Sequence, residues 1–319
     1  MRPVCEARVL VIAGMTAAGK TELGLAAALA LGGEVISADS AAVFRGLDIG
    51  TGKPTAAERR LVPHRCLDLR DPGLPFSVAE YRAAALEAIG ACAARGAVPL
   101  LVGGSGLYIR GVLEEAPLPP APPNPTLRAD LERRADAELQ EALRRVDPDT
   151  AARLNPADRR RVIRALEVHA ATGRPLSAFR HAAPPPRRPH LLVVLDRPPA
   201  ILRARIAERV DRMLEAGLVA EVAGLLAAGV PPEAQCMQAV GYRQTVEHLR
   251  AAGGSVRALR DAIILATTRF AKRQRTWFRR EPGAIWVDLG SGPAAEALPQ
   301  VVELWREGTG PVEGEPPRA

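Results

Sequence analysis

The sequence predicts an α/β fold in which a parallel sheet is flanked by helices and interrupted by an inserted all-helical subdomain. Three observations support this prediction. Short apolar segments rich in β-branched residues alternate with helical segments along most of the 319 residues. A glycine-rich loop joins the first apolar segment to a helix, and one stretch between proline-rich segments has no evident strand. Alternating strands and helices are typical of a parallel sheet covered on both faces.

The first predicted strand leads into a phosphate-binding loop. Residues 8–13 read Arg-Val-Leu-Val-Ile-Ala, and an Ala- and Leu-rich helix is expected over 21–31. The residues between them follow the pattern G-x-x-x-x-G-K-[ST], whose backbone N–H groups hold phosphate oxygens. Lys20 would add a positive charge, and the Thr21 hydroxyl is a candidate Mg²⁺ ligand. The loop comprises Gly14, Met15, Thr16, Ala17, Ala18, Gly19, Lys20 and Thr21.

This loop does not identify its phosphate ligand. ATP, GTP, a sugar phosphate or an isoprenyl diphosphate would all fit it. Nucleotide-hydrolysing proteins usually carry an acidic residue at the end of an apolar strand. Asp68 is a candidate for that position, although the strand before it is poor, and the strand expected at 98–102 is followed by glycine. The sequence therefore predicts phosphate binding and leaves the ligand open.

The other helices and strands are predicted from the periodicity of apolar residues and from residues typical of helix ends. Ser77-Val-Ala-Glu80 forms a predicted capping box that opens a helix to about Ala94. Further strands are expected at 34–37, 98–102, 190–195 and 284–289, and further helices at 199–216 and 255–280.

Two proline-rich stretches mark the ends of the insertion. Residues 116–125 contain six prolines, and Pro184-Pro-Pro-Arg-Arg-Pro189 is the second stretch. Helices are expected between them over 127–146 and 158–171. The expected parts are a discontinuous core of the P-loop NTPase type at 1–115 and 190–306, a helical insertion at 116–189 and a loose tail at 307–319.

A carboxylate follows the second predicted strand. Asp39 and Ser40 come just after residues 34–37, and the carboxyl ends of strands in such a sheet face the ligand crevice. Asp39 is therefore expected within reach of a ligand held by Lys20, where it could act as a general base. The alternative is an ordinary role, because Asp and Ser in loops commonly cap turns.

Six blocks of sequence stand out in order along the chain, namely 14–21, 38–54, 63–68, 101–108, 240–243 and 271–279. They resemble the successive signatures of the tRNA dimethylallyltransferases, over almost the whole chain to about residue 289. Those enzymes transfer a dimethylallyl group from dimethylallyl diphosphate to the exocyclic N6 of the adenosine immediately 3′ of the anticodon. The resemblance implies that tRNA, through its anticodon stem-loop, and dimethylallyl diphosphate are the partners of this chain.

The resemblance also implies roles for individual residues. The loop at 14–21 would hold the diphosphate of the donor rather than ATP, with Mg²⁺ assisting and Thr21 as its ligand. Asp39 would act as general base on the N6 amine, and Arg209 would neutralise the departing diphosphate. Ser105 lies where the family usually has Thr, next to the reacting groups, and because it keeps the hydroxyl the resemblance implies a catalytic role for it. The adenine must leave its stack to react, so it would be drawn into a pocket.

Three segments match regions that contact tRNA in the family. The family pattern is weak at 116–126, so no contact is assigned there. The implied tRNA-contacting residues are Asp39, Ser40, Ala41 and Ala42, then Arg160, Arg161, Val162, Ile163 and Arg164, and finally Lys272, Arg273, Gln274, Arg275, Trp277 and Arg279.

The charge distribution agrees with a polyanionic partner. The formal net charge is +7, residues 151–190 hold nine arginines against two acids, and residues 255–280 hold eight basic residues against one acid. Basic side chains pair with RNA phosphates, and aromatic side chains such as Trp277 can stack on unpaired bases. The alternative for these runs is a solvated helix face with aromatic residues in the core.

Other classes are disfavoured by composition. The four cysteines have no zinc-site spacing, and no apolar run is long enough to span a membrane, so we expect a cytoplasmic protein with reduced thiols. A monomer is also expected, although the sequence does not reveal the oligomeric state. Alternatives to the prenyltransferase are a P-loop kinase acting on a small metabolite, a non-catalytic RNA-binding ATPase, and an isopentenyltransferase acting on free adenine nucleotides. The Arg-rich insertion favours tRNA over a small-molecule acceptor.

Overall fold

The computed structural model describes residues 7–114, 119, 121, 124–179, 187–251 and 254–308. The chain divides into two compact units, one formed by Met1–Glu114 with Arg187–Ala319 and the other by Glu115–Pro186. The insertion was placed at 116–189 from sequence, within a few residues of this division. No helix in the described part of the chain combines the length and apolar character needed to cross a membrane.

The first unit is built on one parallel sheet with the strand order β3-β2-β4-β1-β5-β6. The expected strands are all present, and the poor strand before Asp68 is a two-residue strand at one edge. The α/β fold predicted from sequence is therefore confirmed. The strands are β1 (Val9–Gly14), β2 (Gly33–Ala38), β3 (His64–Arg65), β4 (Val98–Gly103), β5 (His190–Asp196) and β6 (Ala284–Asp288).

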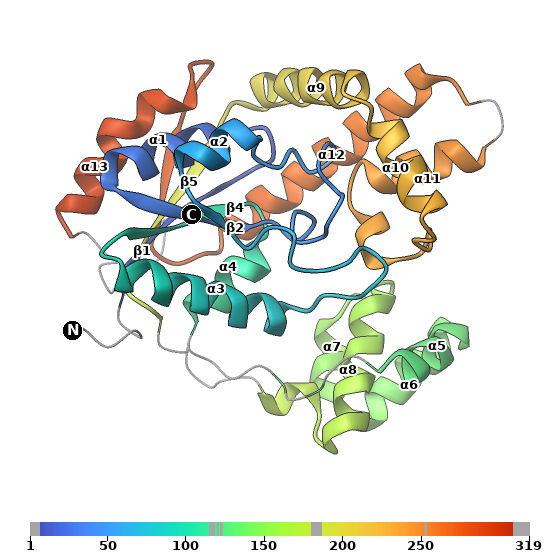
Figure 1. The fold of residues 1–319 in the computed structure, drawn as a ribbon. Helices are drawn as coiled ribbons and strands as arrows, with labels where there is room; N and C mark the ends of the chain where they lie inside the picture. Colours follow the sequence, from blue (N-terminus) through green and yellow to red (C-terminus); the bar gives the residue numbers. More distant parts are fainter. Residues whose placement is uncertain are drawn as a thin grey trace. The chain divides into compact units, whose positions relative to one another are not determined.

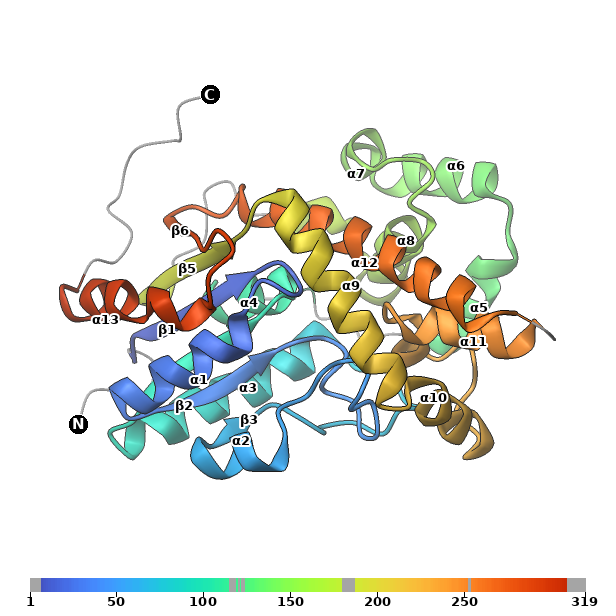
Figure 2. The same cartoon turned by 90° about the horizontal axis from the view of Figure 1, so that it is seen from above.

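Helices cover both faces of this sheet. Helices α1 and α13 lie on one face, while α3 and α4 lie on the other (Figure 1). Helix α9 runs alongside α12 (Figure 2). The helices of this unit are α1 (Lys20–Leu31), α2 (Ala56–Leu61), α3 (Val78–Ala94), α4 (Gly106–Leu113), α9 (Pro199–Glu215), α10 (Leu218–Ala227), α11 (Tyr242–Arg250), α12 (Val256–Phe278) and α13 (Leu298–Arg306).

Alternation along β1 produces the two apolar layers. Val9, Val11 and Ala13 belong to the layer that includes α3, α4 and α12, whereas Leu10 and Ile12 pack with α1 and α13. Side chains of a strand point alternately to opposite faces, so a wholly apolar strand is buried on both sides. The continuous apolar run at the start of the chain is thus explained by its central place in the sheet.

Local signals set several helix ends. The predicted capping box is confirmed, because the Ser77 side chain accepts from the Glu80 backbone N–H while Glu80 caps the backbone of Ser77. Gly14 has a φ of 140°, and a Cβ there would lie 2.5 Å from the Leu195 carbonyl oxygen. This glycine lets the chain leave β1 close to β5 and enter the phosphate loop.

The described part of the second unit has helices and no strand, with α5 (Pro125–Arg133), α6 (Asp136–Val146), α7 (Pro148–Arg153) and α8 (Arg159–Thr172). The single helix expected over 127–146 was wrong: it is two helices, because Arg134 and Ala135 are extended and Glu138 caps the Ala135 backbone N–H. Asp147 starts α7 by accepting from the Thr150 N–H at 3.0 Å.

Candidate active site

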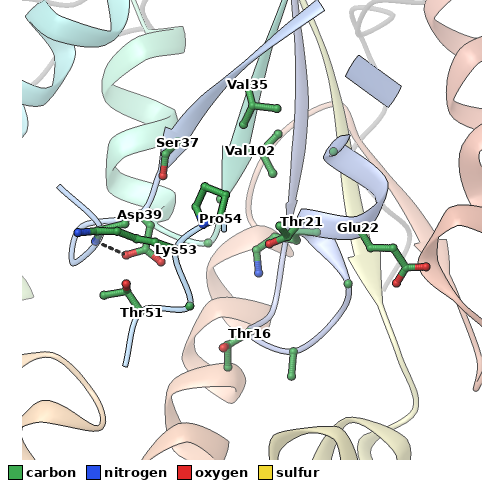
Figure 3. A pocket seen from close by; sticks show the side chains of 18 of the residues that line it. Thr16, Thr21, Glu22, Val35, Ser37, Asp39, Thr51, Lys53, Pro54 and Val102 are labelled. Atoms are coloured by element: carbon green, nitrogen blue, oxygen red, sulfur yellow. Dashed lines mark hydrogen bonds between the residues drawn. The ribbon is translucent and has the colours of Figure 1, made fainter. Parts of the chain in front are cut away.

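A cavity of about 470 Å³ lies at the carboxyl ends of β1, β2 and β4. One wall is the phosphate loop, residues 14–21, and the opposite side carries Ser37, Asp39, Thr51 and Lys53 (Figure 3). The cationic residues that line it are Lys20, Lys53, Arg205, Arg209 and Arg212, and the acidic ones are Glu22, Asp39 and Glu58.

The phosphate loop has the backbone shape that its pattern requires. Ala17 and Gly19 both have positive φ, at 62° and 109°, and α1 begins directly afterwards at Lys20. The first N–H groups of a helix have no acceptor within it and carry the positive end of its dipole. Thr21 is exposed and lines the cavity. The loop therefore offers backbone donors and a hydroxyl to an anionic ligand.

Lys20 sits among charges that control its protonation. Its Nζ donates to the Met15 carbonyl oxygen at 2.7 Å. The pKa of Lys20 is lowered to about 8, chiefly by burial and then by the neighbouring Arg209, while Asp39 acts in the opposite direction. Burial also lowers the pKa of Arg209, again with Asp39 acting in the opposite direction. Asp39 is thus electrostatically coupled to both Lys20 and Arg209.

Asp39 forms a turn cap and also lies at the cavity, and its role as general base stays a prediction. Its Oδ1 accepts from the backbone N–H groups of Ala41 and Ala42, at 2.8 and 3.2 Å, which is a turn cap. The residue also lines the cavity that Lys20 and Arg209 line. Within the described residues, no hydrogen bond occupies its Oδ2. The cap fixes the carboxylate and leaves one oxygen free to accept a proton.

Ser105 joins the ends of two strands rather than lining the cavity. Its Oγ accepts from the Ser40 N–H at 3.0 Å and lies 3.2 Å from Ser40 Oγ, while its own N–H donates to the Ala38 carbonyl. Ser105 therefore fixes the segment that carries Asp39.

A turn at residues 48–53 holds Arg209 in place. The Glu221 carboxylate accepts from the N–H groups of Asp48 and Ile49, at 3.0 and 2.8 Å, and from the Tyr242 hydroxyl at 2.5 Å. The same turn presents the Thr51 carbonyl to Arg209 Nη2 at 2.8 Å. Helices α10 and α11 thereby determine where this guanidinium lies.

Comparisons with known proteins agree with this geometry. Residues 42–281 match the family model described as IPP transferase. The chain belongs to the IPP transferase family. Among its relatives, tRNA dimethylallyltransferase 1 of Trichlorobacter lovleyi is 48% identical, over 88% of this chain and 93% of that protein. The tRNA dimethylallyltransferase of Symbiobacterium thermophilum is 46% identical, over 93% of this chain and 95% of that protein.

Solved structures place the fold in the same group. The tRNA isopentenylpyrophosphate transferase of Bacillus halodurans is 34% identical, with a TM-score of 0.71 over 95% of this chain and 97% of that one. A eukaryotic dimethylallyltransferase acting on tRNA is 25% identical, with a TM-score of 0.80 over 98% of this chain and 82% of that one. The resemblance inferred from the sequence blocks is confirmed.

Within this IPP transferase, the segment 160–164 of α8 divides by exposure. Arg160 and Arg161 are exposed, whereas Val162 and Ile163 belong to the apolar core of the helical unit. Arg164 donates to the Ala121 carbonyl at 2.8 Å. The tRNA contact expected for this segment stays a prediction, and the buried pair would support it only by shaping the helix.

The predicted tRNA-contacting residues at the end of α12 also differ in exposure. Lys272, Arg273 and Arg279 are exposed. Gln274 is buried, where its Oε1 accepts from the Thr16 N–H at 2.8 Å and its Nε2 donates to the Gly104 carbonyl at 3.0 Å. Gln274 therefore supports the phosphate loop, a role that the sequence did not indicate.

Two further members of that segment also contact the protein. Arg275 pairs with Asp196. The guanidinium carbon of Arg110 lies over the Trp277 ring, 4.5 Å from the ring centre. A Cβ on Gly106 would lie 2.2 Å from Trp277 Nε1. Ala42 is likewise buried. An RNA-facing surface on these segments would consist of their exposed members.

Sequence reasoning missed several residues of the site. Arg205 donates from Nε to the Ala17 carbonyl at 3.1 Å and lines the cavity together with Arg212 and Lys53. The spacing of Arg205, Arg209 and Arg212 places them on one side of α9, and this helical spacing was a readable signal. Glu221 gave no such signal, because its backbone partners Asp48 and Ile49 lie more than 170 residues away.

Proposed function

We propose that this chain is a tRNA dimethylallyltransferase that transfers a dimethylallyl group from dimethylallyl diphosphate to N6 of the adenosine immediately 3′ of the anticodon. Diphosphate is the other product. The observation that carries the proposal is the placement of one carboxylate, Asp39, in a cavity shared with a phosphate loop and the guanidinium of Arg209. The relatives named tRNA dimethylallyltransferase support the choice of substrate class.

The acceptor chemistry requires a base that is already in position. The lone pair of an exocyclic amine is delocalised into the ring, so the amine becomes an effective nucleophile only as its proton leaves. Asp39 is held by the N–H groups of Ala41 and Ala42 and has Oδ2 free of partners in the described structure. In the proposed step, Asp39 takes the N6 proton as the N–C bond forms. The adenine enters after leaving its stack.

The leaving group requires positive charge. Breaking the allylic C–O bond leaves the bonding electron pair on the diphosphate. Lys20, Arg209 and the N–H groups at the start of α1 would stabilise that charge as it develops. Because Thr51 holds Arg209 at 2.8 Å, the guanidinium needs little reorganisation during the reaction.

Magnesium fits the donor set of this site. In the described residues no group of three or more His, Cys, Asp or Glu side chains is arranged to hold a metal ion. Mg²⁺ commonly binds through a protein oxygen, substrate phosphates and retained waters, and Thr21 supplies such an oxygen at the cavity. Bound there, Mg²⁺ would neutralise diphosphate charge.

A double-label experiment tests the proposal. The protein is offered dimethylallyl diphosphate labelled in its prenyl group and γ-labelled ATP, together with bulk tRNA or AMP. We expect prenyl label only in tRNA, and mass spectrometry of the digested nucleosides should show dimethylallyl on N6 of adenosine. Label transferred from ATP to a small molecule would establish a kinase, and prenyl label in AMP would establish a free-nucleotide transferase.

The finer expectations from sequence belong to the same proposal. The enzyme would act in the cytoplasm as a monomer on the anticodon stem-loop. Activity on an isolated anticodon stem-loop, with a monomeric elution volume in gel filtration, checks both the substrate and the assembly state.

A further inference from the structure

A buried arginine lies behind the phosphate loop. Arg197 follows β5 directly and is 1% exposed. Its Nε donates to the Ala18 carbonyl at 2.9 Å, and its Nη1 donates to the carbonyls of Gly290 and Gly292, at 3.0 and 2.8 Å. The side chain therefore connects the phosphate loop to the segment after β6.

This guanidinium has no carboxylate partner in the described structure. None of the ion pairs within 4.0 Å includes Arg197, and its Nη2 has no hydrogen-bond partner. Burial and then Arg205 lower the pKa of Arg197, and Glu22 and Asp288 oppose that shift from a distance. An arginine stays protonated in proteins, so a buried positive charge without an ion-pair partner remains in the described structure.

The free end of Arg197 lies beside the loop that would hold the phosphates. A Cβ built on Gly19 would lie 3.5 Å from Arg197 Nη2, and Arg197 itself does not line the cavity. Gly19 is the N-cap of α1 and lines the cavity. An anion bound at the loop would add a compensating charge to those of Glu22 and Asp288.

A second arginine, Arg205, contacts the same loop but lies at the cavity. Arg205 donates to the carbonyl of Ala17, the residue before Ala18, but it also lines the cavity and can touch a ligand directly. Arg197 reaches only the backbone. Two successive carbonyls of the loop are thus held by arginines, one facing the cavity and one behind the loop.

We propose that Arg197 is a positioning residue of the diphosphate site, which fixes the Ala18 carbonyl and supplies a positive charge behind Gly19 that strengthens diphosphate binding. The identity of the anion rests on the proposed function. The competing explanation is that Arg197 only fastens two loops together. In that case any loss of binding would follow the loss of hydrogen bonds and not the loss of charge.

Two substitutions separate charge from hydrogen bonding. Arg197→Lys keeps the charge and loses the forked contacts with three carbonyls, whereas Arg197→Gln also loses the charge. Binding of inorganic diphosphate is measured by calorimetry with folded protein and without tRNA. We expect Arg197→Gln to bind at least about tenfold more weakly than Arg197→Lys, because a charge in a poorly solvated site acts over several ångströms.

Equal diphosphate affinity of the two variants would overturn the inference. Failure of the wild-type protein to bind diphosphate would instead overturn the proposed function. The wild type also provides a measurement that needs no stable variant, namely the NMR resonance of the Arg197 Nε–H. It should shift when diphosphate is added, while that of Arg128 in the helical unit should not. An unmoved Arg197 resonance in diphosphate-saturated protein would contradict the inference.

Discussion

The arginines around the cavity and those of the helical unit have different partners. Arg197, Arg205 and Arg209 donate to the backbone carbonyls of Ala18, Ala17 and Thr51, and no ion pair in the described residues includes any of the three. The helical unit instead pairs Arg128 with Glu167, Arg133 and Arg134 with Asp130, Arg144 and Arg145 with Glu141, Arg159 with Asp136, and Arg161 with Asp158.

The two kinds of partner, carbonyl and carboxylate, have different effects on the charge of an arginine. A carbonyl oxygen fixes a guanidinium without cancelling its charge, so the positive charge at the cavity stays available to an anionic ligand. A carboxylate cancels the charge, and an exposed pair contributes only about 0–1 kcal/mol to stability. Counting basic residues therefore overestimates the RNA-binding potential of the helical unit and underestimates the anion-binding potential of the cavity.

The largest expected effect comes from replacing Asp39, the carboxylate beside Lys20 and Arg209 in the cavity. We expect Asp39→Asn to lower kcat by about 10²–10⁴, because a positioned base is lost. Diphosphate should bind at least as tightly, since Asp39 no longer offsets Lys20 and Arg209. Single-turnover transfer and diphosphate calorimetry check the two effects. A normal kcat would show that Asp39 serves only as turn cap and counter-ion.

Arg209 tests whether an arginine held by a carbonyl acts on the ligand. We expect Arg209→Gln to lower kcat/KM for dimethylallyl diphosphate by about 10²–10³, comparable to losing a preorganised donor. Arg144→Gln is the matched control, because Arg144 is paired with Glu141 on the helical unit and lies outside the lining of the cavity. Equal losses in the two variants would contradict the distinction between the two groups of arginines.

Diphosphate binding at the cavity should depend on pH because of Lys20. Its pKa is lowered to about 8, so the ammonium is charged below that pH and neutral above it. Diphosphate affinity should fall above about pH 8, by up to about tenfold per pH unit, until the higher pKa of the complex is reached. Lys20→Arg stays charged and should lack this step. Titration of the ligand is common to both proteins, so a constant affinity ratio between them would contradict the prediction.

Local sequence signals predicted much of the fold. Residues 8–13, the phosphate loop and the following helix are neighbours in sequence, and the Ser77 capping box closes within four residues. The break between α5 and α6 was missed because it has no glycine or proline: Ala135 is extended, with Glu138 capping its N–H. Its cause is a side-chain contact that competes with good helix propensity.

The site was less predictable where it depends on distant contacts. The sequence correctly indicated that Asp39 and Lys20 would share a crevice, because strand ends meet at one edge of a sheet. It could not indicate that Gln274 turns inward to Thr16, or that Arg197 is buried. Arginine is usually exposed, so composition points the wrong way for such a residue.

The smallest expected effect concerns the exposed end of α12. Lys272 and Arg273 are exposed and form no ion pair in the described chain, unlike Arg144 and Arg145, which both pair with Glu141. We expect Lys272→Ala with Arg273→Ala to weaken tRNA binding and to reduce the slope of log affinity against log salt by about 1.4, if each side chain meets one phosphate of a single strand. Diphosphate affinity should not change.

The doubly substituted Arg144→Ala, Arg145→Ala protein is the control for that measurement. It removes the same number of positive charges, so a general loss of net charge would affect both proteins alike. Binding should survive in the control because its two arginines already share the carboxylate of Glu141, which offsets one of their two charges. Filter binding over a range of salt concentrations distinguishes the two. Equal slopes of log affinity against log salt for the two proteins would mean that carboxylate partners do not decide which basic side chains reach RNA. The distinction between paired and unpaired arginines would then apply only to the cavity.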